Sequence, residues 1–363
     1  MFFFFLLFCY CSTLMTKDPL LLTKETLINQ GLKVENVTES WKFNAQLFPL
    51  TEMPEWFYKI PGAYVIELTG ATLYSDNGIV LYNGKIYQDS LWTWSALYKS
   101  PNDLFPIPAA IPIQGKVATI ALEGNSNYYH WMTEILPRLA LLEQAAIDYD
   151  FLYVPKLQYQ FQKDTLKLLG VDYEKIIEGV SNTHIQPTTV IFPSQVARSC
   201  ITPAWVVEFL QKRFLQSYQV KNGKKRIFIS RGNAAIRRIL NEDAIFEIIK
   251  PFGFEKVLME KMSVIEQAQL AHEAEFIIGT HGAGMTNIVF ARPNTTIIEL
   301  FQEHLDQTFF DLSTTMNLTY YCIKTERISE LSEESVDIRF RNTYINIDLI
   351  KKELIELFER LQL

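Results

Sequence analysis

The sequence predicts an α/β protein with two Rossmann-like parallel-sheet domains and an antiparallel β region ahead of them. Strand patterns alternate with helical patterns in two halves of the chain, which is typical of parallel sheets. Two motifs, at residues 127–131 and 280–287, each fall where a strand pattern gives way to a helix, and ligands bind at that edge of an open parallel sheet. The chain has 363 residues, more than a single hydrophobic core usually holds. We therefore expect two domains that face a shared cleft.

The N-terminal region carries a different pattern. Apolar and polar residues alternate over 62–87 and predict an antiparallel meander, whose Asn83-Gly84 dipeptide favours a tight hairpin turn. The proline-rich stretch 101–112 is interpreted as a linker. The predicted division is 1–15 as an apolar leader or mis-called start, 16–112 as the β-rich region and linker, 113–220 as the first domain, 221–330 as the second, and 331–363 as a tail with a helix.

The elements of the two domains follow from hydrophobic patterns and capping signals. In the first domain, strands are predicted at 116–122, 151–154 and 188–192, with a helix from Tyr128 and another ending near Gly170. In the second, strands are predicted at 226–231, 256–259, 276–279 and 296–300. We expect Asn241 to cap a helix over 241–250, and Ser263 with Glu266 to form a capping box for the next one. Residues 348–361 predict an amphipathic helix.

Composition and charge limit the classes of function. Hydrophobic residues make up 48% of the chain and charged residues 21%, proportions of an ordered globular protein. The net charge is −7, which argues against nucleic-acid binding, because nonspecific affinity comes from phosphate neutralisation. The four cysteines form no metal-ligand spacing beyond Cys9 and Cys11, and they fit a reducing cytosol.

Residues 1–15 are almost wholly apolar, but they fall short of the ~20 residues that span a bilayer. They also lack the basic flank and cleavage site of a signal peptide. A start codon at Met15 and a membrane anchor are both open interpretations. We expect a cytoplasmic protein, with weak membrane association through residues 1–15 as the alternative and the secretory-pathway lumen as the less favoured location.

A basic cluster marks the binding edge of the second domain. Residues 221–238 hold seven basic side chains and no acidic one. Four of them precede the strand, and three follow it at the binding edge, namely Arg231, Arg237 and Arg238. Guanidinium groups offer paired donors that suit phosphate oxygens. The alternative is solvated charge or ion pairs with Glu242 and Asp243.

The turn His281-Gly282-Ala283-Gly284 stands between a strand and a helix. Glycine permits close backbone approach, and a helix N-terminus favours an anion. Glu299, at the end of the next strand, suits a ribose hydroxyl, and His281 is a candidate donor to a phosphate or sugar oxygen. The structural alternatives are a tight turn that merely needs glycine and a histidine that satisfies a loop carbonyl.

A helix in the first domain carries the candidate base. His130, Glu134 and Arg138 are spaced four apart and share one helical face. Pro137 interrupts the hydrogen-bond ladder, so we expect a kink or a restart there. The helix dipole disfavours a cationic His130, and a neutral imidazole is what a general base needs. The alternative is a structural hydrogen bond between His130 and Glu134.

At these residues the chain resembles glycosyltransferase family 61. The similar blocks are Asn127-x-x-His130-Trp131-x-x-Glu134-x-Leu136-Pro137-Arg138, Ser230-Arg231 with 237–242, Gln267, 279–287, and Glu299-Leu300. The combination is specific, although each block alone is not. The resemblance implies a GT-B fold, a nucleotide-sugar held mainly by the second domain, and inverting transfer to a hydroxyl, with uridine diphosphate as the leaving group. It also implies that the C-terminal helix crosses back to the first domain.

The resulting hypothesis is an inverting glycosyltransferase acting on a glycan or polysaccharide. His130, or failing it Glu134, takes the acceptor proton. Donor contacts are expected from Arg231, Arg237, Arg238, His281, Gly282, Ala283, Gly284, Asn287 and Glu299. Acceptor-side contacts are expected from Asn127, Trp131 and Arg138. No cofactor or fixed metal is required, because arginines and a helix dipole supply positive charge; dependence on a divalent metal is left open. The alternatives are another nucleotide-linked polysaccharide-modifying transferase and a non-catalytic glycan- or nucleotide-binding module.

Overall fold

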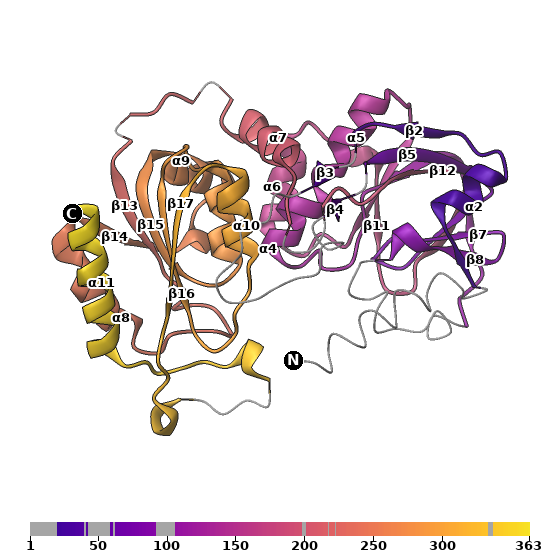
Figure 1. The fold of residues 1–363 in the computed structure, drawn as a ribbon. Coiled ribbons are helices and arrows are strands. Elements are labelled where there is room, and N and C mark those ends of the chain that lie inside the picture. Colours follow the sequence, from indigo (N-terminus) through magenta and orange to yellow (C-terminus); the bar gives the residue numbers. More distant parts are fainter. Residues whose placement is uncertain are drawn as a thin grey trace. The chain divides into compact units, whose positions relative to one another are not determined.

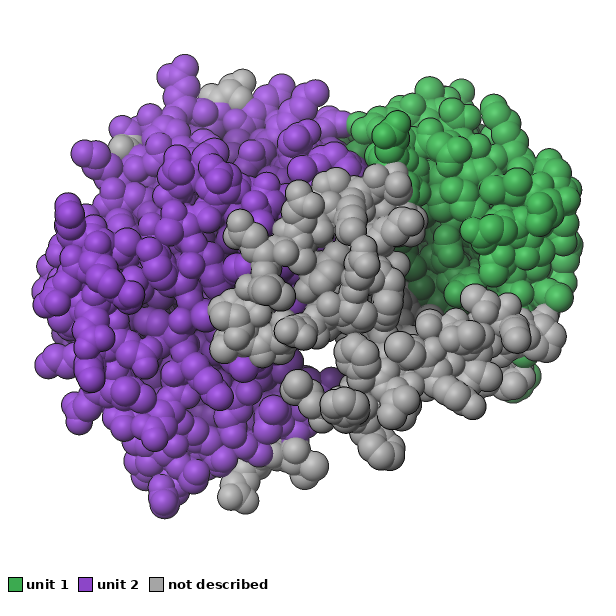
Figure 2. Space-filling view, in the orientation of Figure 1, with its two compact units in different colours: residues 1–43, 59–199 green, residues 44–58, 200–363 purple. Residues whose placement is uncertain are grey.

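The computed structural model describes residues 20–39, 41–42, 59–60, 62–91, 106–197, 201–216, 218–221, 223–332 and 337–363. The chain divides into two compact units, which Figure 2 colours separately. Unit 1 comprises residues 1–43 and 59–199, and unit 2 comprises 44–58 and 200–363. The predicted leader and the start of the predicted linker lie outside the described residues. Among the helices that the structure describes, none combines the length and apolar character needed to cross a membrane.

Unit 1 is built on a mixed sheet (Figure 1). Its parallel part runs in the order β12-β9-β10-β11, formed by β9 (Ile111–Thr119), β10 (Phe151–Pro155), β11 (Ile176–Gly179) and β12 (His184–Pro193). Its antiparallel part consists of β2 (Val34–Asn36), β5 (Tyr64–Thr69), β6 (Thr72–Tyr74), β7 (Ile79–Tyr82) and β8 (Lys85–Tyr87), with β1 (Leu21–Leu22) parallel to β8. A separate pair is formed by β3 (Trp41–Lys42) and β4 (Lys59–Ile60).

The predicted meander is confirmed for β6, β7 and β8. Asn83 and Gly84 join β7 to β8 with φ of 51° and 72°, the left-handed pair that a tight hairpin requires. Strand β5 instead pairs with β12, so the N-terminal β region completes the sheet of the first domain. Pro112 lies inside β9, because extended backbone tolerates the fixed φ of proline, and the predicted linker therefore ends earlier.

The helices of unit 1 are α2 (Lys24–Asn29), α4 (Tyr128–His130), α5 (Arg138–Ala145) and α6 (Gln160–Leu168), with a π-helix, η4 (Trp131–Ile135), between α4 and α5. Two short 3-10 helices are η2 (Gln88–Ser90) and η5 (Tyr173–Lys175). The restart at Pro137 is confirmed, since α5 begins directly after it. The core lies between the sheet and α2, where Leu27, Ile66, Val80 and Tyr153 are fully buried.

Unit 2 holds a five-stranded sheet in the order β14-β13-β15-β16-β17, with every neighbouring pair parallel. The strands are β13 (Lys225–Ile229), β14 (Phe254–Val257), β15 (Ala274–Thr280), β16 (Thr296–Phe301) and β17 (Thr319–Lys324). Because β14 and β15 flank β13 on opposite sides, the winding direction reverses between β13 and β15. The carboxyl ends of two such strands form the crevice in which doubly wound sheets bind ligands.

Helices cover both faces of this sheet (Figure 1). One face carries α8 (Glu242–Ile249) and α11 (Ile347–Leu361), and the other carries α7 (Ala204–Phe214), α9 (Val264–Glu273), the 3-10 helix η8 (Ala283–Phe290) and α10 (Thr308–Thr315). The shorter 3-10 helices are η6 (Lys250–Phe252), η7 (Met259–Lys261), η9 (Ser329–Leu331) and η10 (Ile338–Phe340). The amide of Gln211 in α7 donates to Val289 of η8, which ties α7 to unit 2, whereas the predicted boundary lies at residue 220.

The capping predictions have mixed outcomes. Ser263 and Glu266 form the predicted capping box of α9. Asn241 precedes α8 but makes no capping bond. Its amide group instead pairs with both backbone groups of Ile345, because the C-terminal segment runs beside it.

The C-terminal helix belongs wholly to unit 2. Its apolar side chains, Leu354, Leu357 and Phe358 among them, are buried against α8 and the sheet. The Phe358 ring stacks on Phe254 with centroids 5.7 Å apart. The expectation that this helix crosses back to the first domain is therefore wrong, because its apolar face is covered within unit 2.

Candidate functional site

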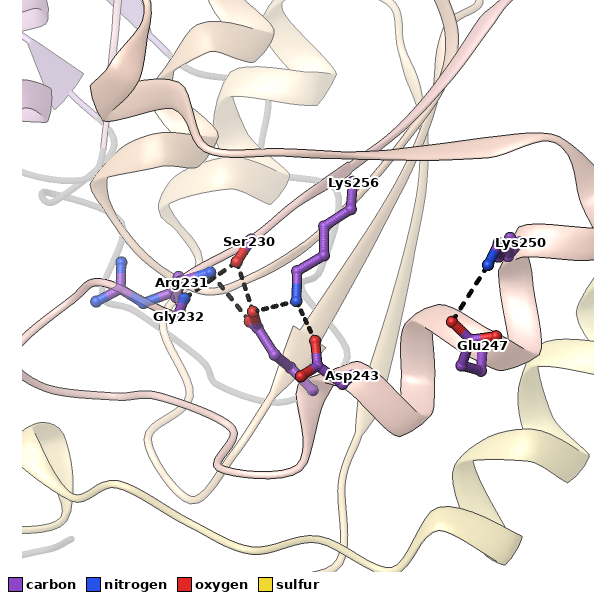
Figure 3. A network of polar contacts seen from close by, with 8 residues as sticks. Ser230, Arg231, Gly232, Asp243, Glu247, Lys250 and Lys256 are labelled. Atoms are coloured by element: carbon purple, nitrogen blue, oxygen red, sulfur yellow. Dashed lines mark hydrogen bonds and ion pairs between the residues drawn. The ribbon is translucent and has the colours of Figure 1, made fainter.

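A buried carboxylate fixes the loop that follows β13. Glu242 accepts hydrogen bonds from the hydroxyl of Ser230 and, at 3.1 Å, from the backbone N–H of Arg231. The ammonium of Lys256 lies 2.9 Å from Glu242 and also pairs with Asp243 (Figure 3). Lys256 is thus the side chain that pairs with both carboxylates. In Figure 3 the Arg231 side chain extends away from Lys256.

The guanidinium of Arg231 closes the loop on itself and meets the glycine turn. Its Nε donates to the carbonyl of Arg237 at 3.2 Å, and Nη2 donates to that of Ile236 at 2.9 Å. A Cβ added at Gly282 would lie 1.8 Å from Nη1 of Arg231. Glycine is therefore required there, because the guanidinium occupies that space. Burial lowers the pKa of Arg231 to about 10, so the group stays cationic at neutral pH.

The other two arginines of the loop are held in unusual surroundings. Arg237 has φ of 55°, a left-handed conformation that costs a non-glycine residue about 1–3 kcal/mol and is typical of functional sites. Within the described part of the chain, its Nε has no hydrogen-bond acceptor. The backbone of Arg238 is fixed on both sides, by the Asn342 side chain at 2.8 Å and the Gln302 amide at 2.7 Å. The loop is thus held in place while the Arg237 Nε stays without an acceptor.

His281 is oriented by Glu299. The Nδ1 atom of His281 lies 2.6 Å from Oε1 of Glu299, whose other oxygen accepts from the hydroxyl of Tyr320. Glu299 is completely buried, and that burial raises its pKa although both partners oppose the shift. The prediction that Glu299 accepts a ribose hydroxyl is corrected, because both oxygens face protein donors. His281 keeps Nε2 for other partners.

The rest of the glycine turn approaches β13 closely. A Cβ at Gly284 would lie 3.2 Å from Ile229, so the turn is pressed against the end of that strand. Asn287 is fully buried, and its amide donates to Gln267 of α9 at 2.9 Å and to the carbonyl of Gly284 at 3.1 Å. Its predicted donor contact is corrected to a role in holding the turn. The N–H groups at the start of η8, including that of Ala283, precede any intrahelical acceptor.

In unit 1 the predicted pair is formed. Nδ1 of His130 lies 2.8 Å from Oε1 of Glu134. Glu134 is buried, with 2% of its surface exposed, while His130 is half-buried. With Nδ1–H donating to the carboxylate, Nε2 is the nitrogen that can accept a proton. The structural hydrogen bond and the base are therefore one arrangement, in which Glu134 orients His130.

Three predicted acceptor-side residues have structural partners in unit 1. Arg138 is completely buried, donates to the carbonyls of Pro193 and Ala121, and has its pKa lowered to about 9 by burial. Trp131 is also fully buried and donates to Thr165 at 2.9 Å. We correct both to structural roles. Asn127 caps α4 by accepting from a backbone N–H, and it is the one of the three that is half-buried.

The structure thus brings the donor-side residues of unit 2 together at the switch point, and it pairs His130 with Glu134 in unit 1. Sequence reasoning missed the residues that hold them, because no local motif marks Tyr320, Gln302, Asn342 or Lys256. A pocket of about 710 Å³ in unit 1 lies elsewhere and is lined by Lys24, Glu25 and Asp89, among others. The predicted site residues do not line it.

Comparison with known proteins agrees with this geometry. Residues 128–298 match the family model described as Glycosyltransferase 61, and the chain belongs to that family, which confirms the resemblance. Over 94 residues it is 33% identical to "Beta-1,2-xylosyltransferase" of Arabidopsis thaliana, a match that covers 22% of this chain and 18% of that protein.

Two animal proteins are similar over a comparable region. The chain is 27% identical over 105 residues to "EGF domain-specific O-linked N-acetylglucosamine transferase" of Mus musculus, which covers 28% of this chain and 20% of that protein. The protein of the same description from Drosophila melanogaster is 26% identical over 116 residues, covering 31% and 22%. The matches thus span about a fifth of the length of each of these relatives.

Proposed function

We propose that the protein is an inverting glycosyltransferase that moves a sugar from a UDP-linked donor to a hydroxyl of a glycan or polysaccharide. The observation that carries the proposal is the meeting of Arg231 with Gly282 at the switch point of the unit 2 sheet. A cation and exposed N–H groups in such a crevice suit a diphosphate. We further propose a GT-B arrangement in which units 1 and 2 face a shared cleft.

Donor binding would rest on the loop after β13 and on the glycine turn. Arg237 and Arg238 supply guanidinium groups for phosphate oxygens, and the start of η8 supplies backbone N–H groups. These donors would stabilise the charge that develops on the diphosphate as the glycosidic bond breaks. Arg231 would act as a positioning residue, since two of its nitrogens already bond to loop carbonyls.

Proton removal from the acceptor would fall to His130. Nε2 accepts the proton from the attacking hydroxyl, and the buried carboxylate of Glu134 stabilises the imidazolium that forms, as an orienting acid does in other histidine-dependent enzymes. The oxygen of the acceptor then bonds to the anomeric carbon, and the bond to the diphosphate breaks on the opposite side. No covalent enzyme intermediate is needed for inversion.

A binding module that lacks turnover is the second candidate, and so is another nucleotide-linked transferase acting on polysaccharide. The His130–Glu134 pair favours an enzyme, because a pure donor-binding module has no use for an oriented base in the other unit. We propose a cytoplasmic location, in line with the charge and the cysteine content of the chain.

The decisive experiment measures donor binding and turnover separately. Binding of a panel of nucleotide-sugars is followed by thermal shift, since a bound ligand stabilises the native state by mass action. Release of uridine diphosphate is then measured with a glycan array as acceptor. Arg237→Ala should weaken donor binding, whereas the exposed Arg360→Ala on α11 should not. Stabilisation by no nucleotide-sugar, or equal affinity in both variants, would contradict the donor site.

A further inference from the structure

Three potential ligands gather beside the proposed donor site of unit 2, on loops that the proposed function does not fully use. His281 follows β15, while His304 and Asp306 lie in the loop between β16 and α10. One ligand atom from each lies within 4.8 Å of the other two. Nε2 of His304 is 3.8 Å from Oδ2 of Asp306. We propose that these three side chains form a site for a divalent transition-metal ion, for which Zn²⁺ is the natural probe.

The donor set matches the chemistry of such an ion. Two imidazoles and one carboxylate suit Zn²⁺ and its neighbours in the first row better than they suit Mg²⁺ or Ca²⁺, which prefer oxygen ligands alone. With bonds of about 2.0–2.2 Å, tetrahedral ligand atoms would lie about 3.4 Å apart. The observed separations are wider by about 1 Å, which rotation of the half-buried His304 and a small shift of its loop can close.

Each ligand is held by a partner on the side away from the cluster. Nδ1 of His281 bonds to Glu299, which leaves Nε2 for the metal, and a carboxylate behind a histidine is the usual second partner of a metal-bound imidazole. The His281 ring also stacks on Phe301, with centroids 5.5 Å apart. Asp306 accepts from the backbone N–H and hydroxyl of Thr308 through Oδ1, and its Oδ2 faces His304.

The charges around the site are balanced in favour of a cation. Two carboxyl groups, Asp306 and Glu299, stand against the guanidinium of Arg237, which interacts with both. Three protein ligands leave a coordination position for water or for a phosphate oxygen. Only this last possibility, a metal that contacts the donor diphosphate, rests on the proposed function; metal binding itself does not.

The site is tested on the untagged full chain after treatment with a chelator. Zn²⁺ binding is measured by calorimetry, and Co²⁺ binding by visible absorption, which reports the coordinating atoms. We expect one ion per chain at this site. His304→Ala and Asp306→Asn should each weaken the ion at least as much as the loss of an outer partner does, about 10–100-fold. Glu247→Gln, which removes an exposed carboxylate on α8, should bind as the wild type does.

Several results would overturn the assignment. These are absence of Co²⁺ absorption in the wild-type chain, unchanged affinity in both ligand variants, and a thiolate charge-transfer band, which would place the ion on a cysteine such as Cys322. His304→Gln at the half-buried loop position serves as a second variant if Asp306→Asn does not fold, as judged by thermal unfolding. Because these readouts need no donor, they separate the metal site from the glycosyltransferase proposal.

Discussion

Replacing Gly282 with alanine should displace Arg231 and with it the donor loop. The new Cβ would lie 1.8 Å from Nη1 and 2.5 Å from Cζ, whereas ordinary contacts begin at 3.4 Å. The guanidinium must therefore move by about 1.6 Å, the difference between 3.4 and 1.8, and its bonds to Ile236 and Arg237 cannot both persist. A hydrogen bond from a charged donor contributes about 1.5–3 kcal/mol. We expect the free energy of unfolding to fall by about 3 kcal/mol.

Donor binding should suffer in parallel. A loop displaced by more than 1 Å no longer presents its arginines to the same oxygens, so we expect affinity for uridine diphosphate to fall at least ten-fold, or about 1.4 kcal/mol. Gly253→Ala is the matched control: Gly253 also has positive φ, but a Cβ there meets nothing within 4 Å. It should cost roughly the 1 kcal/mol of an unfavourable backbone conformation and spare the ligand.

A double-mutant cycle isolates the cause. If the clash with Arg231 is responsible, Gly282→Ala should cost little in a chain that already carries Arg231→Ala, and the coupling energy should approach the whole effect of the single change. Denaturant unfolding and calorimetric binding of uridine diphosphate provide the two measurements. Equal costs of Gly282→Ala in both backgrounds would refute the steric reasoning and point to backbone conformation instead.

Three further predictions concern other parts of the molecule. His130→Ala should slow sugar transfer about 10²–10⁴-fold, the usual contribution of a general base, and should leave binding of uridine diphosphate intact; an unchanged rate would remove His130 from the mechanism. Burial, and then the neighbouring Asp306 carboxylate, raise the pKa of Asp311 to about 8, so the folded chain keeps a proton that the unfolded chain releases near pH 4. Stability of the chelator-treated protein should therefore fall as pH rises from about 4 to about 8, and Asp311→Asn should flatten that slope in urea unfolding measured across the range; a slope that persists would show another group at work. Phe358→Ala should lower the free energy of unfolding by about 3–5 kcal/mol, since its ring is buried against Phe254, and a loss under 1 kcal/mol would contradict the packing of α11.

Much of the fold could be predicted because the parallel strands carry strong local patterns. The segments at 226–231, 276–279 and 296–300 correspond to β13, β15 and β16, and the Pro137 restart follows from the chemistry of proline alone. Strand β17 was not predicted, because its polar and aromatic residues show no buried-strand pattern. The partner of β5 also could not be read from the chain, since pairing with β12 joins residues more than a hundred positions apart.

The candidate site was predicted in its members but not in their roles. Arg231 and Gly282 were both expected to contact the donor, yet their contact with each other depends on the order of β13 and β15 in the sheet. Glu299 was assigned to a ribose because it ends a strand, and only the fold shows that His281 and Tyr320 take both of its oxygens. His304 and Asp306 belong to no motif and acquire meaning only through their distance from His281.

The π-helix over Trp131–Ile135 constrains how this region can change length. Its last bond runs from the Leu136 N–H to the Trp131 carbonyl at 2.9 Å, five residues back rather than four. Deleting one residue here would restore ordinary helical spacing and turn everything from α5 onward by about 100°. The Arg138 guanidinium would then swing out of its pocket of carbonyls. A deletion scan should find residues 131–135 intolerant of shortening, whereas the exposed ends of α6 should accept it.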